Sequence, residues 1–186
     1  MNTPLIHVMS RPSRARLGAL AVILSLSVPA IRADERSRLT EEVSEAVAKF
    51  VAADPSVKKE MSAAAGYAVF PGVGKGGMGI GGAHGTGQVL GNGKILAKVT
   101  LTQVTLGLQL GGQKYAELIL FQNQEALNKF MSGAFTMAAQ ASAVAAASGA
   151  AANAKYAGGV KVVTMAIGGL MYEASVGGQK FNIEKY

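Results

Sequence analysis

A run of glycine over residues 72–87 constrains the fold more than any other feature of the chain. Read with the two-residue period of a β-strand, the odd positions from 77 to 87 are all glycine or alanine, whereas most even positions carry larger side chains. Glycine inside a strand costs conformational entropy and offers nothing to pack. Such a run therefore marks a place where another backbone, a helix or a ligand comes very close.

These glycines do not match a nucleotide-binding motif. Gly77, Gly79 and Gly82 satisfy GxGxxG formally, but further glycines follow where that motif requires a helix to begin. Neither Gly74-Lys75 nor Gly93-Lys94 has the upstream glycine or the following hydroxyl residue of a P-loop. We therefore expect neither a dinucleotide site nor a P-loop.

Residues 1–33 are typical of a secretory signal peptide. They contain four arginines and no acidic residue, and the apolar run 17–28 leads into small residues that fit cleavage after Ala30 or Ala33. The run is shorter than the roughly 20 apolar residues that span a bilayer. Because the chain has no cysteine, it has neither a lipobox nor a disulfide. We expect a single domain over residues 34–186 that is periplasmic or secreted.

The charge of that domain argues against nucleic acid as a partner. Removal of the four arginines would lower the formal net charge from +7 to +3. A charge this small, without a dense basic patch interleaved with aromatic residues, is not typical of nucleic-acid-binding proteins.

Two helices are predicted at the start of the domain. Residues 40–53 have apolar side chains at helical spacing with acidic residues opposite, which fits either a membrane-surface helix or a helix packed on its own domain. Interfacial helices favour basic residues, so the second interpretation is preferred. Asp54-Pro55 is predicted to start a second helix that carries Lys58 and Lys59 and ends before Gly66. This pair of lysines fits a solvated face or, as the functional alternative, contact with lipid phosphate.

The rest of the chain is predicted to consist mainly of strands and turns. In the first half we expect a strand at 67–70 stopped by Pro71-Gly72, the glycine strand, a hairpin turn at 91–94, and strands with a bulge or tight turn near Thr102-Gln103. In the second half we expect a turn at Gly111-Gly112, a strand at 114–121, a helix capped by Asn123 and ended by Gly133, a hairpin with its turn at Gly168-Gly169, and a last strand near 180–183. The repeat of Leu110–Tyr115 as Val176–Phe181 is interpreted as two equivalent hairpin turns. Alanine propensity favours a helix at 134–154, but a strand of small side chains fits equally.

Few residues suit catalysis or metal binding. His84 is the only histidine after residue 33, and no second metal ligand lies near it in the sequence. Glu117 and Glu173 each interrupt an apolar strand; they fit an acid/base pair or, as the preferred interpretation, carboxylates that are hydrogen-bonded, exposed or paired with a lysine such as Lys75. No serine lies in GxSxG. We expect neither an enzyme nor a bound cofactor or metal.

Several segments together resemble the SYLF-domain family. They are the two helices, the stretch 65–71, Lys75 with the glycines after it, the stretch 107–113 and the C-terminal block 168–180, so the resemblance covers the whole of residues 34–186. It implies an α+β fold: a strongly curved antiparallel β-sheet or partial barrel, rich in glycine and alanine, with two N-terminal helices and one short mid-chain helix packed against it. It also implies a strand at 135–147.

The resemblance also implies a function. Eukaryotic SYLF domains bind phosphoinositide membranes, those of yeast adaptor proteins bind actin filaments, and bacterial members look like exported, lipid-associated envelope proteins. Because residues 40–53 are acidic on balance, whereas the family's membrane-binding helix is basic, we carry over lipid binding in general. Lys58, Lys59 and Lys75 are the candidates that face phosphate, and Met78 and Ile80 those that meet acyl chains.

The leading hypothesis is thus an exported, non-enzymatic protein that associates with anionic phospholipid at the cell envelope, peripheral to the membrane. The alternative is a structural protein-interaction module of the envelope, in which the small-residue face receives a partner's strand or helix. An uncharacterised hydrolase remains a third hypothesis because Glu117 and Glu173 are unexplained.

Overall fold

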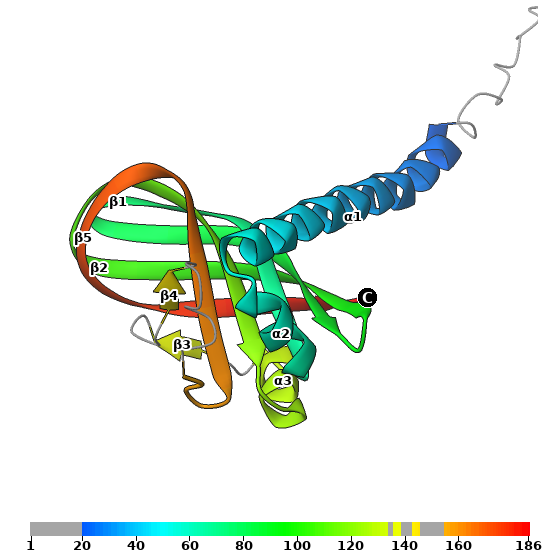
Figure 1. Ribbon diagram of the computed structural model, residues 1–186. Coiled ribbons are helices and arrows are strands. Elements are labelled where there is room, and N and C mark those ends of the chain that lie inside the picture. Colours follow the sequence, from blue (N-terminus) through cyan, green and yellow to red (C-terminus); the bar gives the residue numbers. More distant parts are fainter. Residues whose placement is uncertain (1–19, 134–135, 139–142, 146–154) are drawn as a thin grey trace, which may run out of the picture. The chain divides into compact units, whose positions relative to one another are not determined.

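The computed structural model describes residues 20–133, 136–138, 143–145 and 155–186 (Figure 1). Its elements confirm the predicted α+β class. In chain order they are α1 (Leu20–Ala53), α2 (Ser56–Ala63), β1 (Gly66–Gly91), β2 (Lys94–Phe121), α3 (Gln124–Met131), β3 (Thr136–Ala138), β4 (Ala143–Ala145) and β5 (Val160–Lys185). The chain divides into two compact units, Met1–Ser37 and Arg38–Tyr186.

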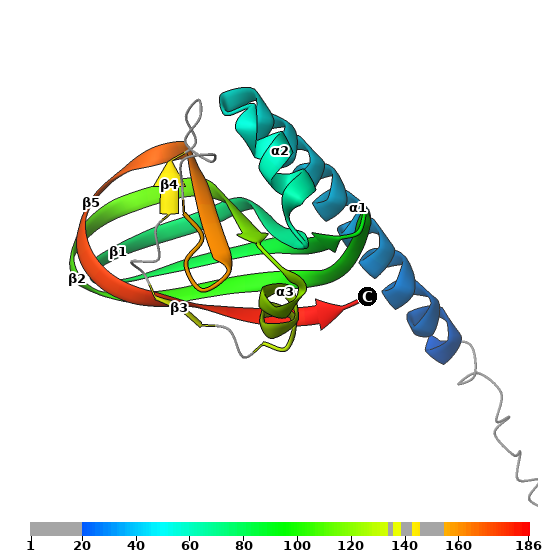
Figure 2. The same ribbon diagram turned by 60° about the horizontal axis from the view of Figure 1, so that its bottom comes forward.

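One strongly bent sheet dominates the second unit. β2 lies between β1 and β5 and pairs antiparallel with both, while β3 pairs antiparallel and β4 parallel with β5. Figures 1 and 2 show the three long strands curving together from end to end. The sheet is not closed into a barrel. The predicted curved antiparallel sheet is confirmed. The single strand predicted at 135–147 is found only in part. β3 and β4 lie within it, but they are two strands, because β3 pairs antiparallel near one end of β5 and β4 pairs parallel near the other. The other residues of this stretch are outside the described part of the chain.

Three predicted breaks between strands were wrong, because β1, β2 and β5 are each continuous. Pro71-Gly72 forms a bulge inside β1. Gly111-Gly112 and Gly168-Gly169 make no turns; instead, Gly76 and Gly77 pair with Gly112 and Gly111, and Gly168-Gly169 pair with the next two residues of β2. Glycines that lie next to one another on three neighbouring strands let the sheet bend sharply at that place. This explains why Gly-Gly pairs, which suggest turns in the sequence, lie in the middle of strands.

The repeated sequence therefore marks two mid-strand segments rather than two hairpin turns. In both copies the aromatic residue, Tyr115 or Phe181, packs in the same hydrophobic core, and the lysine before it, Lys114 or Lys180, is exposed.

Two further local predictions had opposite outcomes. The turn between β1 and β2 is confirmed, with positive φ at Asn92 (52°) and Gly93 (71°). The bulge expected near Thr102-Gln103 was wrong, since both residues pair regularly with β1 and β5. The sequence suggested a bulge because the alternating apolar residues change from odd to even positions at Val104. In the structure this side chain is simply exposed on the opposite face.

The glycine run is explained by a close approach within β1 itself. A Cβ added at Gly87 would lie 2.1 Å from the carbonyl oxygen of Val69, and one added at Gly85 would lie 2.8 Å from Cγ2 of Val73. The first half of β1 thus lies directly against its second half. The predicted close contact exists, and the backbone that comes close belongs to the same strand.

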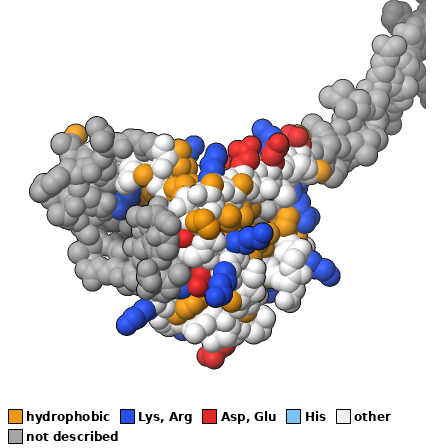
Figure 3. Space-filling model, viewed as in Figure 1, with side chains coloured by type: hydrophobic (Ala, Val, Ile, Leu, Met, Phe, Trp, Pro, Cys, Tyr) orange, Lys and Arg blue, Asp and Glu red, His pale blue; other side chains and the backbone are white. Residues whose placement is uncertain are grey.

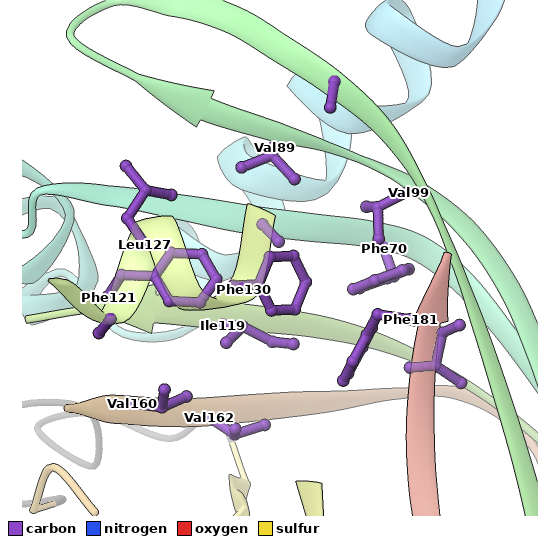
Figure 4. Packing of buried hydrophobic residues seen from close by; sticks show 14 of the residues in the cluster. Phe70, Val89, Val99, Ile119, Phe121, Leu127, Phe130, Val160, Val162 and Phe181 are labelled. Atoms are coloured by element: carbon purple, nitrogen blue, oxygen red, sulfur yellow. The ribbon is translucent and has the colours of Figure 1, made fainter. Parts of the chain in front are cut away.

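Each face of the sheet carries its own core. We call the two sides the α3 face and the α1 face after the helices that cover them. On the α3 face, the ring of Phe130 of α3 packs at a tilt between those of Phe121 and Phe181, with ring-centroid distances of 4.7 and 4.9 Å (Figure 4). The α1 face packs against side chains of α1 and α2, which are Leu39, Val43, Ala46, Phe50 and Val57. The predicted amphipathic helix therefore packs on its own domain.

The helix ends follow the predicted capping residues. Oδ1 of Asp54 accepts hydrogen bonds from the backbone N–H and the hydroxyl of Ser56, at 3.0 and 2.7 Å, at the start of α2. Asn123 caps α3 by accepting a 2.9 Å hydrogen bond from the N–H of Ala126, and Gly133 beyond its end has positive φ. α1 extends further toward the N-terminus than residues 40–53, and the cleavage expected near residue 33 stays a prediction.

The close approach within β1 predicts a position-specific cost of adding one methyl group. We expect Gly87→Ala to lower the free energy of unfolding by more than about 2 kcal/mol, because the Cβ would clash with backbone that cannot rotate away. Gly74→Ala is the matched control, since nothing lies within 4 Å of its added Cβ. Urea denaturation of both variants measures the difference; equal midpoints would contradict the proposed contact.

A buried ion pair joins α2 to β5. Nζ of Lys161, which is buried, lies 2.7 Å from Oε2 of Glu60 and 4.6 Å from the ring centroid of Tyr156. We expect Glu60→Gln to destabilise the protein by about 1–3 kcal/mol, because it removes the carboxylate that faces a buried ammonium, and partial exposure of Glu60 moderates the loss. Thermal unfolding beside the exposed control Glu41→Gln tests this, and an unchanged melting temperature would show that the pair contributes nothing.

Candidate functional site

The structure does not bring the predicted lipid-contact residues together. Lys58 and Lys59 are exposed on α2. Lys75 is half-buried, and its charge acts on Glu117, which is buried. Met78 and Ile80 are 80% and 68% exposed near the middle of β1. Met78 and Ile80 are thus accessible to a ligand. The predicted lysines do not lie together, because Lys58 and Lys59 belong to α2 whereas Lys75 lies near buried Glu117.

An apolar residue from β2 joins the exposed pair of β1. Gly82 pairs with Val104, so Val104 and Ile80 point to the same face as diagonal neighbours. Val104 is 62% exposed. We call Met78, Ile80 and Val104 the exposed apolar cluster. The sequence did not reveal the contribution of Val104, because an apolar residue at this even position was interpreted as the sign of a bulge and not as an exposed side chain.

Basic side chains follow this cluster in the next row of the sheet. Thr102 pairs with His84 on one side and with Lys180 on the other. Because residues two apart in a strand share a face, both lie on the same side as Val104. His84 and Lys180 are exposed, and we call these two residues the basic row. The surface therefore changes from apolar to basic between two neighbouring rows of side chains that cross β1, β2 and β5. Only the register of the strands reveals this arrangement.

Lys58 lies instead in a separate, shallow cleft between α1 and α2. The cleft has a volume of about 730 Å³, and Val47, Val51, Met61 and Tyr67 contribute to its lining. Partial burial raises the pKa of Tyr67, so its hydroxyl stays protonated near neutral pH.

Figure 3 shows hydrophobic side chains in the middle of this view bordered by basic ones, with acidic side chains gathered along α1.

A second depression lies between α1 and the sheet, with a volume of about 700 Å³. We call it the groove. α1 contributes Glu42, β1 contributes His84 and β2 contributes Lys114 to its lining. His84 thus belongs both to the groove and to the basic row beside the exposed apolar cluster, which makes the two surfaces continuous.

Glu117 is enclosed on the α3 face. Its Oε2 accepts a 3.0 Å hydrogen bond from Nε2 of Gln179, while its Oε1 has no partner in the described part of the chain. Burial raises the pKa of Glu117 to about 7, and the hydrogen bond from Gln179 and the charge of Lys75 lower it in part. The interpretation of Glu117 as a hydrogen-bonded carboxylate is confirmed. The side chain of Glu173 lies outside the described residues.

The raised pKa predicts how stability depends on pH. Between about pH 4.5 and pH 7 folded Glu117 holds a proton that the unfolded chain has released, so the free energy of unfolding falls as pH rises through this window. We expect Glu117→Gln to remove this slope and to be more stable than the original chain at pH 8 by at least about 1 kcal/mol, given about 1.4 kcal/mol per pKa unit. Urea titrations from pH 4.5 to 8, with exposed Glu125→Gln as control, measure it; parallel curves for Glu117→Gln and the original chain would contradict it.

Within the described residues, no helix is both long and apolar enough to span a bilayer. No three histidine or acidic side chains there come close enough together to hold a metal ion.

Comparison with known proteins identifies one family. The model of the Ysc84 family, described as Las17-binding protein actin regulator, matches residues 102–185. This segment includes most of β2, α3 and all of β5, and with them Val104, Lys114, Glu117 and Lys180. No curated protein matches the chain. The resemblance seen in the sequence is confirmed, and residues 102–185 form a Ysc84 (SYLF) domain segment.

Proposed function

We propose that this protein is an exported, non-enzymatic lipid-binding protein that associates with anionic phospholipid at the cell envelope. The observation that carries the proposal is the exposed apolar cluster with His84 and Lys180 in the row behind it. Membership of the SYLF family supports it, since the family is associated with lipid and actin. Lys58 and Lys59 lie on α2, whereas this row is built from β1, β2 and β5.

The geometry suits a peripheral, reversible contact. Exposed apolar side chains gathered on one surface are typical of interaction sites, and Met78, Ile80 and Val104 can enter the boundary between head groups and acyl chains. Lys180 would then meet the phosphates. Because each lysine near an anionic surface contributes only about 1 kcal/mol, such binding is weak and salt-dependent.

A second candidate is a protein-interaction module of the envelope. Among the described strands β1 is at the edge of the sheet, with β2 on one side and no strand on the other. An unpaired edge can receive an extended segment of a partner through backbone hydrogen bonds. Recovery of a stoichiometric protein partner from envelope extract, without lipid, would favour this candidate.

Vesicle co-sedimentation of the chain from Asp34 onward tests the first candidate. We expect vesicles that contain an anionic lipid to bind more protein than neutral vesicles do, and this excess to be lost at high salt. Lys180→Gln should weaken binding about fivefold, which corresponds to about 1 kcal/mol, and the double variant Ile80→Ser/Val104→Ser should bind still less. Lys129→Gln on α3 and Tyr186→Ser are the controls.

Two other results would change the assignment. If Lys58→Gln/Lys59→Gln loses binding while Lys180→Gln keeps it, the contact surface lies on α2. If the original chain sediments with neither kind of vesicle, the lipid proposal fails and the interaction module is preferred.

A further inference from the structure

The walls of the groove come from two parts of the domain. Leu39, Glu42, Ala46 and Lys49 recur at three- and four-residue spacing, so one side of α1 forms one wall. Pro71, Gly72 and residues 84–86 of β1 line the other side, and parts of β2 and β5 complete it. At about 700 Å³ the groove lies within the range of about 300–1,000 Å³ that is common for small-molecule sites.

The sheet side of the groove carries positive charge. Lys114 lies across Gly72, because a Cβ added there would lie 2.8 Å from Cε of the lysine. Lys114 is exposed and forms no ion pair within the described part of the chain. His84 offers an imidazole N–H from β1 beside it. These groups can meet an anion without first breaking an existing ion pair.

The helix side carries negative charge. Glu42 and Glu45 both line the groove from α1. Oε2 of Glu45 lies 3.7 Å from Nζ of Lys49, whereas Glu42 has no ion-pair partner among the residues that the structure describes. A cation in the groove would therefore be met by Glu42. Lys49 lines the same wall and offsets the charge of Glu45, so the helix side keeps one net negative charge opposite Lys114.

Between these charges the lining is apolar. Leu39 and Ala46 come from α1, Ala116 from β2, and Met165 and Ile167 from β5. Ile167 is 49% exposed. A ligand that fits the whole groove has an anionic group, a cationic group and an apolar part.

We propose that the groove binds one molecule of a zwitterionic phospholipid whose head group joins a phosphate to an ammonium. Lys114 and His84 hold the phosphate, Glu42 holds the ammonium, and the apolar lining receives the start of an acyl chain. The inference rests on the proposed lipid binding and adds a second mode, in which the protein holds a single lipid as well as docking on a surface. His84 connects the two, since it lies where the groove meets the basic row.

The groove favours a zwitterionic head group over an anionic one. A phosphate without an ammonium would satisfy Lys114 but would bring negative charge toward Glu42 and Glu45, and like charges repel. An ammonium without a phosphate would be repelled by Lys114. Only a head group with both charges matches both walls.

Isothermal titration calorimetry of the full chain tests this with two soluble lipids of equal chain length, each below its micelle concentration. The probes are dihexanoyl phosphatidylethanolamine and dihexanoyl phosphatidylglycerol, which differ in the ammonium group. We expect the phosphatidylethanolamine to bind at least about tenfold more tightly, because charge-assisted hydrogen bonds are about twice as strong as neutral ones.

Two variants separate the two walls. Lys114→Gln should weaken binding of both lipids by at least about fivefold, since it removes a charged partner of the phosphate they share. Glu42→Gln should weaken only phosphatidylethanolamine and should leave phosphatidylglycerol unchanged or more tightly bound. Lys129→Gln and Glu125→Gln on α3 are the matched controls and should change neither affinity.

The outcomes distinguish this inference from the proposed function. Equal affinity for both lipids, or no effect of Glu42→Gln, would overturn the zwitterionic assignment. No binding of either soluble lipid by a chain that still sediments with anionic vesicles would overturn the groove and leave the membrane-contact surface standing. Lipid binding that depends on Lys114 and Glu42 in a chain that sediments with no vesicle would support the groove and overturn the membrane contact.

Discussion

The backbone of Val69 lies so close to the α-carbon of Gly87 that no side chain fits between them. This contact lets β1 turn back on itself, and the rest of the sheet depends on it. β2 pairs with β1 on one side and with β5 on the other along most of its length, so all three strands must follow the same bend. Glycines at matching levels of the three strands allow them to do so without losing the hydrogen-bond ladder.

The bend gives the two faces different roles. The α3 face holds a phenylalanine core closed by α3, and the same enclosure removes Glu117 from water and raises its pKa. The α1 face is covered by α1 and α2 over only part of its area. What remains uncovered is the exposed apolar cluster, the basic row and the groove, so the candidate functional surfaces all lie on one side of the sheet.

Local sequence signals were accurate where a few neighbouring residues decide the structure. Asp54 and Asn123 cap helices because their side chains reach the next free backbone N–H groups, and Asn92-Gly93 form the hairpin turn because both tolerate positive φ. The same reasoning failed at Gly111-Gly112. A glycine pair has the same local preferences in a turn and in a bent strand, and only the pairing partners decide between them.

The sequence by itself determined the fold class, the helix boundaries near the caps, the small-residue face of β1 and the resemblance to the SYLF family that the match over residues 102–185 supports. These features depend on periodicity, local hydrogen bonding and motif. The tertiary structure alone decided what approaches the glycines, which lysines share a surface and how deeply Glu117 is buried. These features depend on contacts between residues far apart in the chain, such as Val69 with Gly87, Glu60 with Lys161 and Glu117 with Gln179. Register and packing bring such residues together, and neither can be inferred from a single strand.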